Sequence, residues 1–276
     1  MTNNNPVVSV IITTYNREKS LGRAIKSVLK QSYCNIELIV IDNGSTDGTR
    51  AVIQSYANSF KIKYIYQRDQ NRYIYALNEG INNAEGKYIA VLDDDDFWCD
   101  EDKTKKQVSF LEKNTDYVLV GGGLIGIDQG GEEIARYLLP EKDADIKKTI
   151  LISNTLAHTT VLYRKDAWEK AGGYDEGVDW GLWLRMGKEG KFYNMQEFFI
   201  VYTGHARGNP GYLEKKYTRW EWLKINIGLK KKHKSDYPGY RRALLFCWIR
   251  YFYSFLPFRL PLKRELWSLL FKIRKL

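Results

Sequence analysis

The feature that most constrains this chain is an apolar segment, Tyr88–Leu92, that runs directly into four consecutive aspartates, Asp93–Asp96. Its aliphatic and aromatic side chains, after the turn-forming pair Glu85-Gly86, predict a buried strand. The aspartates then lie at the C-terminal end of that strand, the edge where open α/β sheets bind ligands. Adjacent carboxylates repel one another by about 1 kcal/mol per close pair even in a water-like dielectric. We therefore expect a divalent cation here, because Mg²⁺ and Mn²⁺ prefer oxygen ligands. The alternative is a solvated acidic loop before the next helix.

Apolar runs alternate with amphipathic stretches through the N-terminal part of the chain, which predicts alternating strands and helices. We expect strands at residues 7–13, 36–42, 62–66 and 88–92, and helices at residues 18–31, 73–83 and 102–113, with another helix between the turn at 43–48 and residue 56. This alternation predicts a doubly wound, mostly parallel α/β sheet with right-handed crossovers. The first, second and fourth strands then bring polar residues to one edge: Thr13, Tyr15, Asp42 and the aspartate run.

Composition narrows the class of protein. The 276 residues fit one large domain or two small ones, and three widely spaced cysteines favour neither a disulfide framework nor a zinc site, which suits a reducing cytosol. The N-terminus lacks a secretory pattern, and no apolar run is long enough to span a membrane. A net charge of +10 indicates attraction to an anionic partner.

No GxGxxG motif follows the first strand and no P-loop motif occurs in the sequence, so neither of these phosphate-binding loops is supported.

The pattern becomes irregular after residue 115. Strand-like pieces at 117–120 and 161–163, a helix-like stretch at 145–152 and several glycines predict a mixed half, suited to binding an acceptor. We expect three parts: 1–115, 116–210 and 211–276.

Two polar residues of the second part have more than one interpretation. Asp179 stands at the start of an apolar helix, where it either caps the backbone N–H groups or takes a proton from a substrate hydroxyl. His205 follows a strand-like segment at 198–202. A lone histidine is more often structural, but imidazole is also a common metal ligand.

The last part, from Gly211 onward, is aromatic and basic. Apolar residues at helical spacing, among many arginines and lysines, predict a pair of amphipathic helices broken at Pro257 and Pro261 that could lie on an anionic membrane. Arg250 interrupts the apolar run, so we do not expect a membrane span. The alternative is that these aromatic residues pack on the rest of the protein or on a second subunit.

Four segments, residues 8–17, 41–49, 85–98 and 179–185, together resemble the inverting glycosyltransferases of family 2, which have the GT-A fold. The likeness covers roughly Val7 to Gly208. It implies that 1–115 is the nucleotide-sugar-binding half of a GT-A domain and 116–210 the acceptor half. Three positions depart from the family pattern and bear on acceptor identity and phosphate contacts: Leu77, Val178 and Gly181.

The resemblance also implies a role for each polar residue. On the nucleotide side, Thr13 and Tyr15 line the base pocket, Asp42 accepts from the N3–H of the base, and Arg72 contacts the nucleotide.

On the reacting side, Asp95 holds a Mg²⁺ or Mn²⁺ ion that bridges the donor diphosphate, and Asp93 and Asp94 lie by the ribose and the metal. His205 completes the metal shell and Asp179 is the catalytic base.

The implied reaction moves a hexose from a UDP-sugar to a hydroxyl of a saccharide, with inversion. The implied acceptor is lipid-linked, in the biosynthesis of bacterial O-antigen, capsule or lipooligosaccharide, and the implied location is cytoplasmic, peripheral at the inner face of the cell membrane. We expect no nucleic-acid partner, and the oligomeric state stays open. Two alternatives remain: a sugar-1-phosphate nucleotidyltransferase, whose lysine-bearing glycine loop the chain lacks, and a basic nucleic-acid-binding protein.

Overall fold

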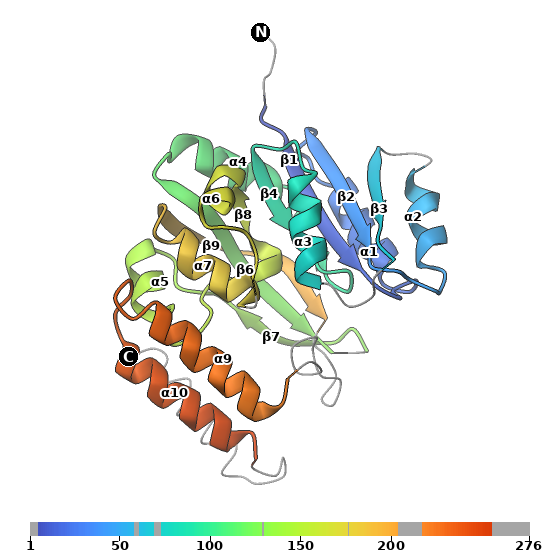
Figure 1. Ribbon diagram of the computed structural model, residues 1–276. Helices are drawn as coiled ribbons and strands as arrows, with labels where there is room; N and C mark the ends of the chain where they lie inside the picture. Colours follow the sequence, from blue (N-terminus) through green and yellow to red (C-terminus); the bar gives the residue numbers. More distant parts are fainter. Residues whose placement is uncertain are drawn as a thin grey trace. The chain divides into compact units, whose positions relative to one another are not determined.

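The N-terminal half of the sheet is parallel. Its strands are β1 (Val8–Thr14), β2 (Ile36–Asp42), β3 (Ile62–Tyr66) and β4 (Tyr88–Val91), in the order β3-β2-β1-β4 (Figure 1). Register pairs of Val10 with Leu38 and with Ala90 place β1 between β2 and β4. All seven residues of β1 are buried, as its apolar run predicts.

Helices cover both faces of this sheet, which is the predicted doubly wound arrangement. One face carries α1 (Leu21–Leu29), α2 (Thr49–Ala57) and α4 (Lys103–Lys113). The other carries α3 (Tyr73–Asn82). A Cβ added at Gly80 of α3 would lie 2.6 Å from Ile41 Cδ1 and 2.7 Å from Ile11 Cγ2, so α3 approaches β1 and β2 closely.

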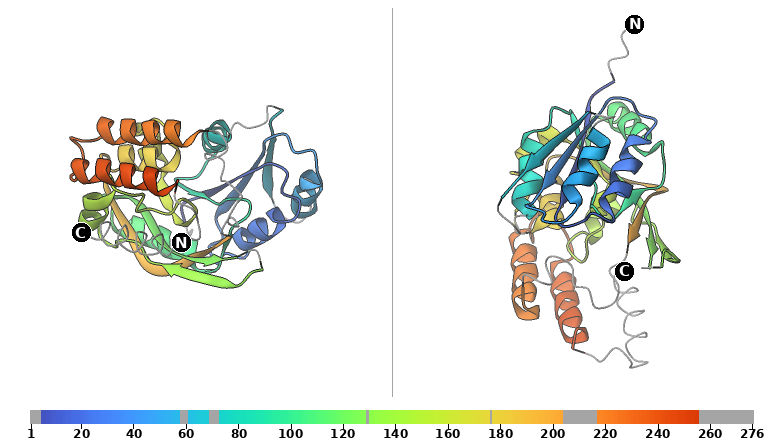
Figure 2. Two further views of the ribbon diagram at one scale, coloured as in Figure 1. Left: turned by 90° about the horizontal axis from the view of Figure 1, so that it is seen from below. Right: turned by 90° about the vertical axis from the view of Figure 1, so that its right-hand side faces the viewer.

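The second half of the sheet is mixed. Its strands are β5 (Phe97–Trp98), β6 (Tyr117–Ile127), β7 (Glu133–Tyr137), β8 (Leu162–Arg164) and β9 (Lys191–Thr203). Within the described residues the full order is β3-β2-β1-β4-β8-β6-β9-β5, with β7 beside β6. Strand β8 runs antiparallel to both β4 and β6, whereas β6 and β9 are parallel (Figure 2).

The strand predicted at 117–120 is too short, because Gly121–Gly123 continue it. A Cβ at Gly122 would meet the ring of Phe199, and one at Gly121 would meet the side chain of Asn194. The glycines therefore give β9 room to pack against β6. The strand predicted at 198–202 is too short for the same reason, since the pairing with β6 extends β9 back to Lys191.

Three short helices lie between the strands of this half of the sheet in the sequence: η1 (His158–Thr160), α6 (Lys165–Lys170) and α7 (Val178–Met186). Arg185 of α7 ties the helix to the turn that follows α6. Its guanidinium donates to Ala171 O at 2.8 Å, to Gly173 O at 2.5 Å and to Asp175 Oδ2 at 2.6 Å. The last turn of α7 is thus held by three charge-assisted hydrogen bonds from Arg185.

The computed structural model describes residues 5–57, 61–68, 73–128, 130–175, 177–203 and 217–255. Contacts divide the chain into two compact units, Met1–Glu141 with Leu156–Gly204, and Lys142–Thr155 with His205–Leu276. The sheet lies in the first unit.

The second unit contains α5 (Asp143–Thr149), α9 (Arg219–Lys232) and α10 (Tyr240–Tyr253). Helix α9 starts with a capping box, in which Thr218 and Glu221 satisfy each other's backbone N–H groups. Helices α9 and α10 run side by side (Figures 1 and 2). The predicted breaks at Pro257 and Pro261 lie outside the described residues. Among those described, no helix combines the length and apolarity needed to cross a bilayer.

Candidate active site

The four strand-end aspartates differ in their surroundings. Asp93 Oδ1 accepts a hydrogen bond from the hydroxyl of Tyr73 at 3.3 Å. Arg17 contacts the next two, with Nε 3.2 Å from Asp94 Oδ1 and Nη2 3.7 Å from Asp95 Oδ2. These three carboxylates lie at the edge to which the sequence assigns ligand binding.

Asp96 has a structural role. It is fully buried, and its carboxylate accepts from Thr203 N at 3.0 Å and from Thr159 Oγ1 at 3.4 Å. Burial, and then the charges of Asp93 and Asp95, raise its pKa well above the ordinary value. Asp96 therefore joins the aspartate loop to β9.

Burial makes the loop costly to ionise at Asp94. Burial raises the pKa of Asp94 to about 7, although the charge of Arg17 acts in the opposite direction. A carboxylate that is costly to ionise in this way is stabilised by a nearby cation. The main chain at the site is held in place, because Asp95 O accepts from Arg23 Nη2 at 2.9 Å and from Thr203 Oγ1 at 2.7 Å.

Asp93 and Asp95 can supply part of the coordination shell of a divalent cation, with substrate phosphates supplying the rest. Among the described residues, no three His, Cys, Asp or Glu side chains converge to form a complete metal site. Mg²⁺ commonly binds through one or two carboxylates plus substrate phosphates, so Asp93 and Asp95 suffice as the protein's share. His205, predicted as a further ligand, lies outside the described residues, as does Arg72 on the nucleotide side.

The other nucleotide-side residues lie at the ends of neighbouring strands. Thr13 is buried in β1, Tyr15 follows that strand and is half-buried, and Asp42 ends β2. Asp42 is fully buried, and it accepts from Ser45 N at 2.8 Å and from Tyr64 Oη at 3.1 Å. Each carboxylate oxygen still has a second lone pair for a further donor.

Asp179 lies in the first turn of α7. The N-cap position belongs to Gly177, and no side chain caps it, so the interpretation of Asp179 as an N-cap is wrong. Val178, just before it, has φ +49°, a left-handed conformation that is strained for a β-branched residue. Such strain costs about 1–3 kcal/mol and persists only where the surroundings enforce it.

Tyr73 connects the strand-end aspartates to Asp179. Its crowded surroundings first, then the charges of Asp93 and Asp179, raise its pKa well above the ordinary value. Both charges act on one phenol, which is hydrogen-bonded to Asp93, so Asp93 and Asp179 both lie near the Tyr73 side chain.

Sequence reasoning missed four residues of this site: Arg17, Tyr73, His158 and Tyr174. Burial lowers the pKa of His158 and the charge of Asp179 acts in the opposite direction. His158 Nε2 lies 2.9 Å from Tyr174 Oη. The one available signal was the polar run His158–Thr160 directly before a strand, since polar residues at that point need buried partners.

Comparison with known proteins relates this chain to one family. A model described as Glycosyl transferase family 2 matches residues 9–172. The chain is 38% identical over 208 residues to EpsE of Bacillus subtilis (strain 168), named as a glycosyltransferase, covering 71% of this chain and 72% of EpsE. It is 27% identical over 266 residues to the amylovoran biosynthesis glycosyltransferase AmsE of Erwinia amylovora, covering 90% of this chain and 94% of AmsE.

Solved structures share the fold. S. aureus TarS 1–349 in complex with UDP-GlcNAc is similar with a TM-score of 0.72 at 17% identity, covering 96% of this chain and 79% of that one. The mannosyltransferase PcManGT from Pyrobaculum calidifontis, in complex with GDP-Man and Mn²⁺, has a TM-score of 0.64 at 16% identity, covering 96% and 80%. At these identities the likeness shows the fold alone, which is the GT-A fold expected from the sequence.

Proposed function

The chain belongs to glycosyltransferase family 2, and on that premise we propose that it moves a hexose from a UDP-sugar to a saccharide hydroxyl, with inversion. The observation that carries the proposal is the position of Tyr73. Its phenol is hydrogen-bonded to Asp93, and the charges of both Asp93 and Asp179 raise its pKa. Two carboxylates near one phenol suit the two tasks of the reaction, stabilising the leaving group and activating the acceptor.

Asp93 and Asp95 would hold a divalent cation, with Asp94 beside it. When bound, Mg²⁺ or Mn²⁺ stabilises the negative charge that develops on the departing diphosphate. The Mn²⁺ in the structure of PcManGT supports this assignment. His205 remains a proposed further ligand. Arg17, which contacts Asp94 and Asp95, adds a positive charge at the same edge.

Asp179 would act as general base. A sugar hydroxyl is too weakly acidic to ionise at neutral pH, so a carboxylate within hydrogen-bond reach must receive its proton. General-base catalysis of this kind contributes about 10² to 10⁴ in rate. The new bond forms on the face opposite the leaving group, which gives a β-glycoside from an α-linked donor.

Thr13, Tyr15, Asp42 and Arg72 would bind the nucleotide. The complex of TarS with UDP-GlcNAc supports a UDP-sugar, whereas the GDP-Man complex of PcManGT makes guanosine diphosphate the competing choice. The name of AmsE, an amylovoran biosynthesis glycosyltransferase, supports a role in bacterial surface polysaccharide biosynthesis. The acceptor in this proposal is a lipid-linked saccharide. In this proposal 1–115 binds the donor and 116–210 the acceptor.

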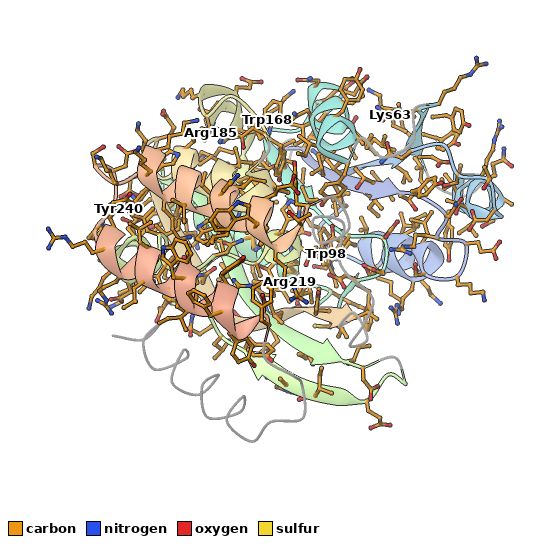
Figure 3. The ribbon with its side chains drawn as sticks, turned by 60° about the horizontal axis from the view of Figure 1, so that its bottom comes forward. Lys63, Trp98, Trp168, Arg185, Arg219 and Tyr240 are labelled. Carbon is orange, nitrogen blue, oxygen red and sulfur yellow. The ribbon has the colours of Figure 1, made fainter. Side chains whose placement is uncertain are left out.

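The 211–276 part would hold the enzyme at the cytoplasmic face of an anionic membrane. Its described residues expose four large aromatic side chains, Trp220, Trp248, Phe252 and Phe255. Cations lie over two of them. Arg219, at the start of α9 (Figure 3), is 4.9 Å from the ring centroid of Phe255, and Lys224 is 5.4 Å from that of Trp220. Aromatic side chains with a basic border are typical of surfaces that lie on anionic lipid.

A panel of nucleotide sugars tests the proposal. The purified protein is incubated with UDP- and GDP-sugars in Mn²⁺, Mg²⁺ or EDTA, and the released nucleoside diphosphate is measured. We expect release from a UDP-sugar that EDTA abolishes and Asp93→Asn reduces, while Asp166→Asn, a control on the exposed surface of α6, has no effect. Salt-sensitive binding of RNA or DNA with no response to any nucleotide sugar would contradict it.

A further inference from the structure

His158 lies against the face of α7 that carries Asp179. Trp183 follows Asp179 by one helical turn, so the two side chains share a face. The ring of His158 packs on Trp183 with centroids 6.2 Å apart. The charge of Asp179 acts on the titration of His158 and also on Tyr174. An imidazole therefore packs on the face of α7 that carries the carboxylate assigned as base by the proposed function.

The His158 ring is held by a buried tyrosine. Its Nε2 lies 2.9 Å from Tyr174 Oη, and the two rings make an edge contact at 5.6 Å. Tyr174 is 4% exposed, and Asn78 of α3 fixes its main chain on both sides, accepting from Tyr174 N at 2.9 Å and donating to Tyr174 O at 2.9 Å. The hydroxyl of Tyr163 is farther from that of Tyr174, at 3.4 Å.

Burial favours the uncharged form of both side chains. Burial lowers the pKa of His158, and burial raises that of Tyr174 well above the ordinary value. The protonated phenol can therefore donate to Nε2, which leaves the proton of the neutral ring on Nδ1. Tyr174 is the hydrogen-bond partner of the ring among the described residues. The titratable groups around the pair are Tyr73, Tyr163 and Asp179.

We propose that the hydrogen-bonded pair of His158 and Tyr174 positions Asp179 to receive the proton of the acceptor hydroxyl. This inference rests on the proposed function. His158 packs on α7 at Trp183, one turn after Asp179, and a neutral ring adds no positive charge near the carboxylate that must accept a proton. His158 is a positioning residue, because it acts on the acceptor through Asp179.

The alternative is that the pair only fills space. Both interpretations predict that His158→Ala harms the protein, so the test must separate stability, donor binding and turnover. The positioning role predicts a loss in kcat alone, because the donor binds at the strand-end aspartates and the base acts only in the transfer step. A misplaced catalytic group costs up to about 10²-fold in rate.

The experiment compares His158→Gln, His158→Ala and Tyr174→Phe with the unmodified enzyme. We expect kcat for transfer to fall about 10- to 100-fold in His158→Ala and Tyr174→Phe, and less in His158→Gln, whose amide can still hydrogen-bond to Tyr174. The Kd for UDP with metal and the melting temperature of His158→Gln should stay unchanged. The double variant His158→Ala/Tyr174→Phe should lose little more than either single variant, because the two residues act as one unit.

Tyr163→Phe is the matched control. It removes a neighbouring hydroxyl that is only 3.4 Å from Tyr174, and transfer should remain within about twofold. Unchanged kcat in His158→Ala, or a loss of UDP affinity in parallel with kcat, would overturn the inference. Failure of the unmodified enzyme to transfer from any nucleotide sugar would instead overturn the proposed function, so the two failures are distinct.

Discussion

The hydroxyl of Tyr73 lies 3.3 Å from Asp93 Oδ1 and donates a hydrogen bond to it, while the charge of Asp179 acts on the same phenol. Tyr73 comes from α3, Asp93 from the end of β4 and Asp179 from α7. The doubly wound sheet places α3 across β1 and β2, so the start of this helix is close to the strand-end edge. The candidate site therefore depends on packing between elements that are distant in sequence.

Tyr73→Phe should weaken the metal-dependent step. A hydrogen bond to a charged group contributes about 1.5–3 kcal/mol, so loss of the Tyr73 hydroxyl removes from Asp93 a hydrogen bond worth roughly tenfold or more in an equilibrium constant. We expect a higher Mn²⁺ concentration for half-maximal transfer with little change in melting temperature. Tyr75→Phe, on an exposed side chain of the same helix, is the control. An unchanged Mn²⁺ requirement in Tyr73→Phe would contradict the assignment.

Gly80→Ala should destabilise the protein. The added methyl would lie within 2.7 Å of Ile41 and Ile11 side chains, and overpacking of this kind costs about 1–3 kcal/mol. Gly228→Ala in α9 is the matched control, since no atom lies within 4 Å of its added Cβ. That change should be neutral or stabilise by about 0.5–1 kcal/mol. Denaturant unfolding measures both, and equal stabilities for the two variants would show that α3 does not pack as described.

Lys103 should make stability depend on pH. It is fully buried, its Nζ lies 4.0 Å from the ring centroid of Trp98 and 2.8 Å from Gln107 Oε1, and burial lowers its pKa to about 7. Between pH 7 and the ordinary lysine value, the unfolded chain binds a proton that the folded chain does not. Stability from this residue therefore rises with pH across that window, by at most about 1.4 kcal/mol per pH unit.

The comparison of Lys103→Met with Lys105→Met tests this dependence. Lys105 is largely exposed, so its replacement should leave the pH profile of the unfolding free energy unchanged. Lys103→Met should remove the rise between pH 7 and 10. A rise that persists in Lys103→Met would mean that another group is responsible.

The exposed aromatic residues of α9 and α10 should bind anionic vesicles. Full burial of an aromatic side chain contributes about 1.5–3 kcal/mol, so the double variant Trp248→Ser/Phe252→Ser should lose at least about tenfold in affinity for phosphatidylglycerol vesicles. Tyr137→Ser removes an exposed aromatic side chain from β7 and is the control. Binding that is unchanged in the double variant would favour packing on protein for these residues.

Local pattern predicted the parallel half of the sheet well. The bounds of β2 and β3 agree with the prediction, because both strands are short apolar runs with clear turns around them. The strand predicted at 117–120 did not include the glycine run of β6, since the contact with Phe199 that explains this run comes from a strand distant in sequence. Propensity is local, whereas pairing across a sheet depends on the whole fold.

The same limit explains which residues of the candidate site could be predicted from the sequence and which could not. The carboxylates of the aspartate run and Asp179 carry a chemistry that can be recognised from residue type and position. Tyr73 and His158 do not, because a tyrosine or a lone histidine is ordinary until its neighbours are known. Asp96 shows the converse, since it belongs to the acidic run but is buried against Thr203 as part of the framework.

Transfer and UDP binding by Asp179→Asn test the central claim most directly. The amide keeps the size of the side chain but cannot accept the proton of the acceptor hydroxyl. We expect the transfer rate to fall about 10²- to 10⁴-fold. The Kd for UDP in the presence of Mn²⁺ should stay within about twofold of that of the unmodified enzyme. The control variant Asp166→Asn should show the same unchanged Kd. Transfer at the rate of the unmodified enzyme in Asp179→Asn would contradict the assignment of this carboxylate as the base.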